Sequence, residues 1–238
     1  MAVVDNADKL TIMKLTLLFC WIPFQAHSQV QGKVELDRNM FNAEKPSESV
    51  KIRASVSYKG NQSIQEVPYL DIKTDSTGIT HTNVDVKYYL FIDPDLHEYF
   101  YYRNFSDTSK VVMHCKGGNP FEKYGGWDLY SDKKFDYDES QKLANTVISS
   151  NDYSRYRFRK IKNGKADDFI LYTLCGKKEI PIIYLKPFSK EIGCPVVRLD
   201  TYYEGRLVSI TQLQYISDTL TSKEKRVFQA WQKNLELY

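Results

Sequence analysis

The stretch Val50-Lys51-Ile52-Arg53-Ala54-Ser55-Val56-Ser57-Tyr58 alternates between apolar and polar side chains along its whole length. Successive side chains of a β-strand point to opposite faces of the sheet, so this period of two predicts a strand with one buried and one wet face. The residues of a tight turn, Lys59-Gly60-Asn61-Gln62, follow directly. This unit predicts a fold built from strands that are joined by short turns.

Similar segments recur along most of the chain between turn signals. We predict strands at Gly32–Asp37, Ile64–Thr74, Ile79–Asp93, Glu98–Phe105, Lys110–Cys115, Ser154–Ile161, Asp168–Cys175, Glu179–Lys186, Pro195–Glu204 and Arg206–Ser217. Pro68 indicates an edge position or a bulge in its strand, because proline cannot donate a ladder hydrogen bond. Short sequential connections predict a mainly β (β-rich α+β) protein with a curved antiparallel sheet, either a half-barrel or a sandwich.

The clearest helix lies at the C-terminus. The segment Thr221–Glu224 (TSKE) has the pattern of a capping box, which marks a helix start. Apolar residues then follow at helical spacing, at Val227, Phe228, Trp231 and Leu235. We predict that this C-terminal helix packs on the sheet. A partner-binding role for its apolar stripe is the alternative.

Two segments depart from the strand pattern. Residues 116–140 are rich in glycine and charge, and we predict an irregular excursion there. In Glu139–Ser149 the apolar residues have helical spacing, which predicts a short helix. We find no linker, so residues 29–238 are expected to form a single β-rich domain.

The beginning of the chain resembles an export signal. Lys14 precedes the ten-residue apolar run Leu15–Phe24, and Ala26-His27-Ser28 has the small-x-small pattern of a cleavage site. We predict a signal peptide at residues 1–28, with Met13 as the true start, and a secreted or periplasmic mature protein. The run is shorter than the roughly 20 apolar residues of a membrane span. Lipidation at Cys20 and a buried N-terminal strand or helix are the alternatives.

Three cysteines would remain after cleavage. An oxidising compartment allows one disulfide among them, and we prefer Cys175–Cys194, which flank a two-strand unit. Pairing of Cys115 with either of the others, or three thiols, is the alternative. The net charge of +3 favours no particular partner, and we expect no nucleic acid among the partners.

One strand-like segment carries a row of arginines. Arg155, Arg157 and Arg159 alternate with Tyr156 and Phe158, so three guanidinium groups would share one face. Guanidinium groups bind phosphates bidentately, which predicts an anion-binding ridge. The alternative is a solvent-facing row that discourages edge pairing, and a neighbouring strand could also offer carboxylates.

Aromatic residues gather in the irregular excursion. Trp127 follows two glycines, and Tyr124 and Tyr130 are close in sequence. They are candidates for contact with a ligand or a partner. The alternative is that Trp127 anchors the excursion into the core.

No motif for catalysis or metal binding is present in the sequence. It has no Gly-x-Ser-x-Gly, no His-Glu-x-x-His and no phosphate-binding glycine loop. Adjacent residues of a strand point to opposite faces, which argues against His114 activating the thiol of Cys115. We predict no catalytic residue, no metal site and no cofactor.

Residues 179–205 resemble the C-terminal signature of the GLPGLI family of secreted bacterial proteins. The resemblance rests on Glu179-Ile180-Pro181-Ile182, Phe188, Gly193-Cys194-Pro195-Val196-Val197, Asp200 and Gly205. Cys194 and Val196 depart from the family's hexapeptide, so the diagnostic run is not intact. The resemblance implies a location in the envelope and brings no catalytic residues.

These observations favour an exported, non-enzymatic binding or interaction protein of the bacterial cell envelope. Its partner would be an apolar small molecule, an envelope polymer or an envelope protein, and no transmembrane span would remain after cleavage. Two alternatives stay open. One is a hydrolase with a dispersed active site, and the other is a surface protein that binds anions or lipid headgroups.

Overall fold

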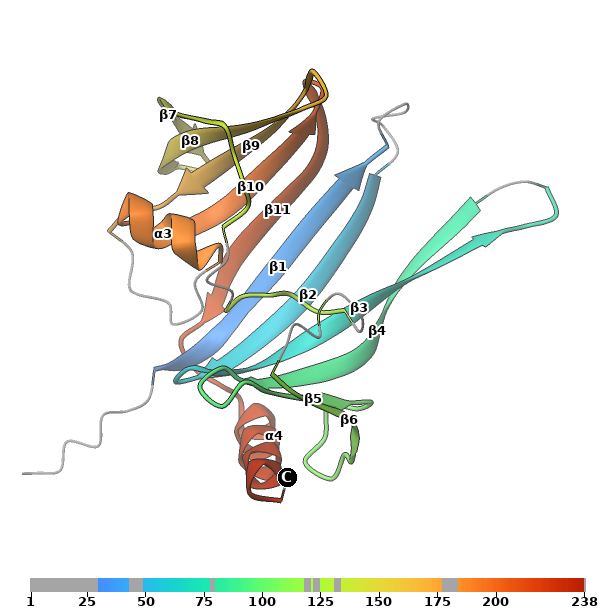
Figure 1. Cartoon of the computed structure of the whole chain (residues 1–238). Helices are drawn as coiled ribbons and strands as arrows, with labels where there is room; N and C mark the ends of the chain where they lie inside the picture. The colour runs from blue at the N-terminus through green and yellow to red at the C-terminus, as the bar shows by residue number, and fades with distance from the viewer. Residues whose placement is uncertain are drawn as a thin grey trace, which may run out of the picture.

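The computed structural model describes residues 30–42, 49–77, 80–117, 121, 125–130, 134–176 and 184–237. In these residues eleven strands form one curved antiparallel sheet, which stays open between its edge strands β6 and β7 (Figure 1). The strands are β1 (Gln31–Phe41), β2 (Ser49–Lys59), β3 (Gln62–Thr74), β4 (Thr80–Asp93), β5 (Glu98–Tyr102), β6 (Val111–Lys116), β7 (Glu139–Ile148), β8 (Asn151–Lys162), β9 (Lys165–Thr173), β10 (Val196–Tyr203) and β11 (Arg206–Ser217). The predicted fold class is confirmed, whereas the predicted signal peptide lies outside the described residues.

At β1 and β2 the two faces of the sheet differ in polarity. Val34 and Leu36 of β1 lie opposite Val56 and Ala54 of β2, and all four are fully buried on what we call the core face. The opposite face, the reverse face, carries polar residues such as Asp37. This division follows directly from the period of two in β2.

A helix covers each face of the sheet. On the core face, Phe188 of α3 (Lys186–Ile192) is fully buried and its ring centroid lies 4.8 Å from that of Phe158. On the reverse face, Trp231 of α4 (Ser222–Gln232) stacks on Tyr102 at 3.7 Å between ring centroids. The predicted packing of the C-terminal helix on the sheet is confirmed; a short 3-10 helix, η1 (Lys233–Glu236), continues it.

The predicted capping box at the start of α4 is also confirmed. The Thr221 hydroxyl accepts from the backbone N–H of Glu224 at 3.2 Å, and the Glu224 carboxylate accepts from the backbone N–H of Thr221 at 2.8 Å. Ser57 of β2 also donates to Glu224, at 3.0 Å. Burial alone would raise the pKa of Glu224, but the hydrogen bonds from Thr221 and Ser57 and the charge of Lys33 lower it below its ordinary value.

The short helix predicted at Glu139–Ser149 is wrong, because residues 139–148 form strand β7. A bulge between Leu143 and Thr146 explains the misleading apolar spacing, because the extra residue breaks the alternation of a regular strand. The hairpin turn at Ser149 and Ser150, both at positive φ, joins β7 to β8. Backbone pairing with β8 therefore overrides the local pattern.

The strand predicted at Glu179–Lys186 is not confirmed either. Residues 177–183 lie outside the described residues, and Lys186 begins helix α3. Pro187 occupies the first helical turn, where its fixed φ suits the helix and its missing N–H costs nothing. The described residues between 117 and 138 form no strand.

The preferred disulfide is present. Cys175, after β9, is bonded to Cys194, after α3, across a separation of 19 residues. Cys115 is in the thiol form. A disulfide that closes such a loop stabilises the fold by reducing the freedom of the unfolded chain.

We predict that Thr221→Ala lowers the free energy of unfolding by about 1 kcal/mol, because the first turn of α4 loses its cap. Urea denaturation measures this difference. The control Gln229→Ala, at an exposed position of the same helix, should change the stability by less than about 0.5 kcal/mol. Equal losses in the two variants would show that the capping box does not hold α4.

Candidate functional site

The sheet splits between β2 and β3. These strands pair through four residue pairs, of which Val56 and Gln65 are the last. Beyond this point β3 pairs with β4 in a long hairpin, and we call residues 68–74 and 80–88 the arm. Figure 1 shows the arm leaving the sheet and diverging from β2. A bulge lies between Val67 and Pro68, as the proline indicated.

Two side chains of β3 fix the chain at the split. If pairing continued, Glu66 would face Ser55; instead its carboxylate accepts from the backbone N–H of Ser55 at 2.7 Å. On the core face, the side-chain oxygen of Gln65 accepts from the backbone N–H of Trp127 at 3.1 Å. The Glu66 carboxylate thus takes the place of a strand carbonyl for the Ser55 N–H, and Gln65 satisfies a donor of the excursion.

The Trp127 indole is buried. It is 8% exposed, and the Arg38 guanidinium lies 4.3 Å from its ring centroid. The Tyr130 hydroxyl is also buried, close to Ser63, and burial raises its pKa. Both side chains therefore anchor the excursion on the core face. Tyr124, the third residue of this predicted set, lies outside the described residues.

Arg38 is a functional candidate that the sequence analysis missed. It is half-buried on the core face of β1, and its Nε donates to the Thr211 hydroxyl at 3.0 Å. Tyr184 lies beside it: burial raises the pKa of this phenol, while the charge of Arg38 opposes the rise. Within the described part of the chain, no carboxylate lies within ion-pair distance of Arg38. The alternation of Val34, Leu36 and Arg38 along β1 was the signal that could have placed it on this face.

Several arginines of the reverse face have carboxylate partners. Three of them contact an aspartate through two nitrogens each. The pairs are Arg53 with Asp37, Arg159 with Asp168, and Arg198 with Asp200. Bidentate pairing of this kind neutralises the guanidinium and fixes its plane. Arg38 differs from these arginines both in its face and in its environment.

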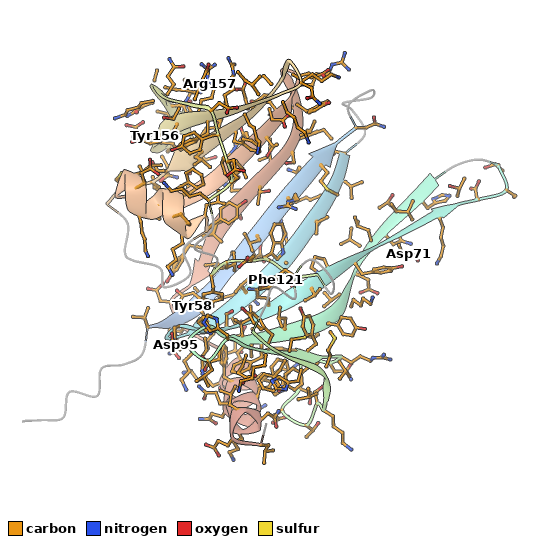
Figure 2. All side chains as sticks on the ribbon, viewed as in Figure 1. Tyr58, Asp71, Asp95, Phe121, Tyr156 and Arg157 are labelled. Atoms are coloured by element: carbon orange, nitrogen blue, oxygen red, sulfur yellow. A yellow bond between two sulfur atoms is a disulfide. The ribbon has the colours of Figure 1, made fainter. Side chains whose placement is uncertain are left out.

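The predicted arginine ridge lies far from the arm, as the positions of Arg157 and Asp71 in Figure 2 show. Arg159 is held by Asp168, and this contact lowers the pKa of the aspartate. Arg157 donates to the side chain of Gln141, and Arg155 donates to the backbone carbonyl of Ala144 at 2.8 Å. Two of the three guanidinium groups therefore have uncharged partners, and the ridge stays a prediction for these two.

One buried carboxylate lies beside a histidine. Glu98 of β5 is 6% exposed and contacts both His114 and Lys116 of β6. Burial raises the pKa of Glu98, but the hydrogen bonds from Lys116 and His114 outweigh it and lower the pKa. His114 stacks on Phe100, whereas Cys115 packs in a different apolar cluster. The arrangement is an ion-pair cluster, and it does not bring the thiol to the imidazole.

A pocket of about 150 Å³ lies on the reverse face, between the start of α4 and the split. Its polar groups already bond one another: Glu224 contacts Ser57 and Lys33, and Glu66 contacts Ser55. These contacts hold α4 and the split in place. Among the described residues, no cluster of metal-binding side chains occurs and no helix has the length and apolar character of a membrane span.

The core face is only partly covered. Along β1, Val34 and Leu36 are fully buried, whereas Arg38 and Met40 are half-buried. On β2, the residues paired with these last two, Ile52 and Val50, are half-buried as well. We call Arg38, Met40, Val50 and Ile52 the open part of the core face. It lies beside the split.

The arm adds exposed apolar side chains on the other side of the split. Leu70 lies directly opposite Val84, and Ile72 lies opposite Thr82, so these side chains share one face of the arm. Ile72 is 62% exposed and Val84 is 40% exposed. Alternation along β3 from Gln65 on the core face places Leu70 and Ile72 on the reverse-face side of the arm.

No protein-family model matches the chain, and no curated protein matches it in sequence. Among solved structures, the chain is similar to LprF from Mycobacterium bovis, with 10% identity, a TM-score of 0.38, and coverage of 82% of this chain and 88% of that chain. It is also similar to the ywiB protein from Bacillus subtilis, with 9% identity, a TM-score of 0.17, and coverage of 82% and 99%.

A third similar structure is a Vibrio parahaemolyticus domain described as an outer membrane lipoprotein-sorting protein, with 8% identity, a TM-score of 0.24, and coverage of 86% and 91%. At such low identities and TM-scores, these three likenesses carry no argument about the function of this chain.

We predict that Trp127→Ala lowers the free energy of unfolding by about 3 kcal/mol, because the excursion loses its buried anchor. Thermal and urea unfolding followed by circular dichroism measure the loss. The control Tyr69→Ala, at an exposed position of the arm, should cost less than about 1 kcal/mol. A Trp127→Ala protein as stable as the control would place the indole outside the core.

Proposed function

We propose that this chain is an exported, non-enzymatic binding protein of the bacterial cell envelope. It holds an apolar ligand against the open part of its core face, beside the split. The observation that carries the proposal is the change in burial along β1 and β2, where the apolar face continues beyond the side chains that cover it.

The covered part of the core face is filled by the protein itself. Phe188 of α3 and Phe135 lie with ring centroids 4.5 Å apart, and Trp127 lies over β1. Interiors packed at this density leave no room for a ligand. A ligand therefore has access to the open part, where Met40 and Ile52 remain half-buried.

Contact with an apolar ligand is more favourable for the surface around the split than contact with water. Each half-buried aliphatic side chain there gains from a further loss of contact with water, at roughly 25 cal/mol per Å² of apolar surface. Large contiguous apolar patches are rare on the surfaces of soluble proteins, and where they occur they often mark a binding site.

The disulfide supports export. Disulfides form and persist in oxidising compartments such as the periplasm, and they are rare in the cytosol. The Cys175–Cys194 bond therefore agrees with the signal peptide that the sequence predicts at residues 1–28.

We expect a neutral lipophilic fluorophore to bind the mature protein saturably, with an emission increase that follows a one-site isotherm. The variant Ile52→Thr should weaken binding about tenfold, because it removes apolar contact area at the open part. The matched control Ile161→Thr, at a 50% exposed site on β8 far from the split, should bind like the parent protein. A flat titration, or equal affinities of the two variants, would contradict the proposed function.

A further inference from the structure

Arg38 stands at the inner end of the open part of the core face. Its neighbours on β1 are the fully buried Leu36 on one side and the half-buried Met40 on the other. Its cross-strand partners are Ile52 on β2 and Thr211 on β11. A permanent positive charge therefore lies where the covered apolar core ends and the open apolar surface begins.

Among the residues that the structure describes, the groups around Arg38 position the guanidinium but do not neutralise it. Trp127 offers the face of its ring and Thr211 accepts one hydrogen bond. Arginine carries five N–H donors, and the hydroxyl groups of Thr211 and Tyr184 cannot satisfy all of them. A half-buried cation is screened less by solvent than a surface cation, so an arriving anion would interact with it more strongly than with an exposed arginine.

We propose that Arg38 binds the anionic headgroup of an amphiphilic ligand whose apolar chain lies along the open part of the core face. The inference rests on the proposed function and deepens it, because it names the class of ligand. The headgroup is a carboxylate or a phosphate, since both accept two parallel N–H bonds from one guanidinium.

The placement of the apolar residues fits this orientation of the ligand. Trp127 and Tyr184 are buried behind Arg38 and close the inner end. Met40 of β1 and its neighbours Val50 and Ile52 of the paired strand β2 lie on the outer side. A ligand with its charge at Arg38 therefore directs its chain outward, along these three side chains and towards the split.

Three fluorescent probes with the same long alkyl chain test the inference on the mature protein. One ends in a carboxylate, one in a phosphate monoester, and one in a neutral methyl ester. At least one of the two anionic probes should bind about tenfold or more tightly than the ester. The comparison of carboxylate with phosphate then identifies the headgroup.

Arg38→Gln should remove this preference, so that the anionic probes and the ester bind with similar affinity. Arg38→Lys keeps the charge and should retain most of the preference, which guards against a Gln variant that folds poorly. The control Arg226→Gln, at an exposed site on α4 across the sheet, should leave the preference unchanged.

The outcomes separate the two proposals. Equal affinity of all three probes for the parent protein would overturn the role of Arg38 and leave the apolar site standing. A preference that survives in a folded Arg38→Gln protein would overturn it as well. Absence of saturable binding by any probe would contradict the proposed function itself, and the headgroup inference with it.

Discussion

The ladder between β2 and β3 ends after four residue pairs, and the rest of the molecule is arranged around that end. An antiparallel sheet that stops pairing in its interior exposes backbone donors and acceptors on two strands at once. Here Glu66 accepts from the Ser55 N–H on one side, and Gln65 accepts from the Trp127 N–H on the other. The two adjacent side chains therefore end the ladder and fix the excursion across the core face.

The split also determines where apolar surface remains. The excursion crosses the sheet at the split, so it covers Val34 and Leu36 but leaves the outer ends of β1 and β2 half-buried. The arm, freed from β2, presents Ile72 and Val84 to solvent. Arg38 lies between the covered and the open parts, in contact with Trp127. The proposed binding site thus lies beside the same local feature that shapes the sheet.

The sequence predicted the features that local patterns determine. The strands at Val50–Tyr58 and Arg206–Ser217 and the start of α4 at Thr221–Glu224 were predicted correctly. Their signals depend only on residues that are neighbours in the sequence. The split has only Pro68 as a local sign, since the pairing of β3 is decided by tertiary contacts. The bulge in β7 imitated helical spacing and misled the prediction there. Arg38 was missed because its lack of a carboxylate partner among the described residues depends on strand register and on which side chains reach across the sheet.

Amide hydrogen exchange of the free protein, resolved by residue with NMR, tests the split most directly. The Ser55 amide points away from β1, and alternate amides of β2 point the same way, so those of Lys51, Arg53 and Ser57 do too. The account predicts slow exchange at Ser57, which is paired with Ile64, and fast exchange at Lys51 and Arg53, beyond the end of the ladder. Protection of Lys51 and Arg53 as strong as that of Ser57 would show a continuous sheet and would contradict the account.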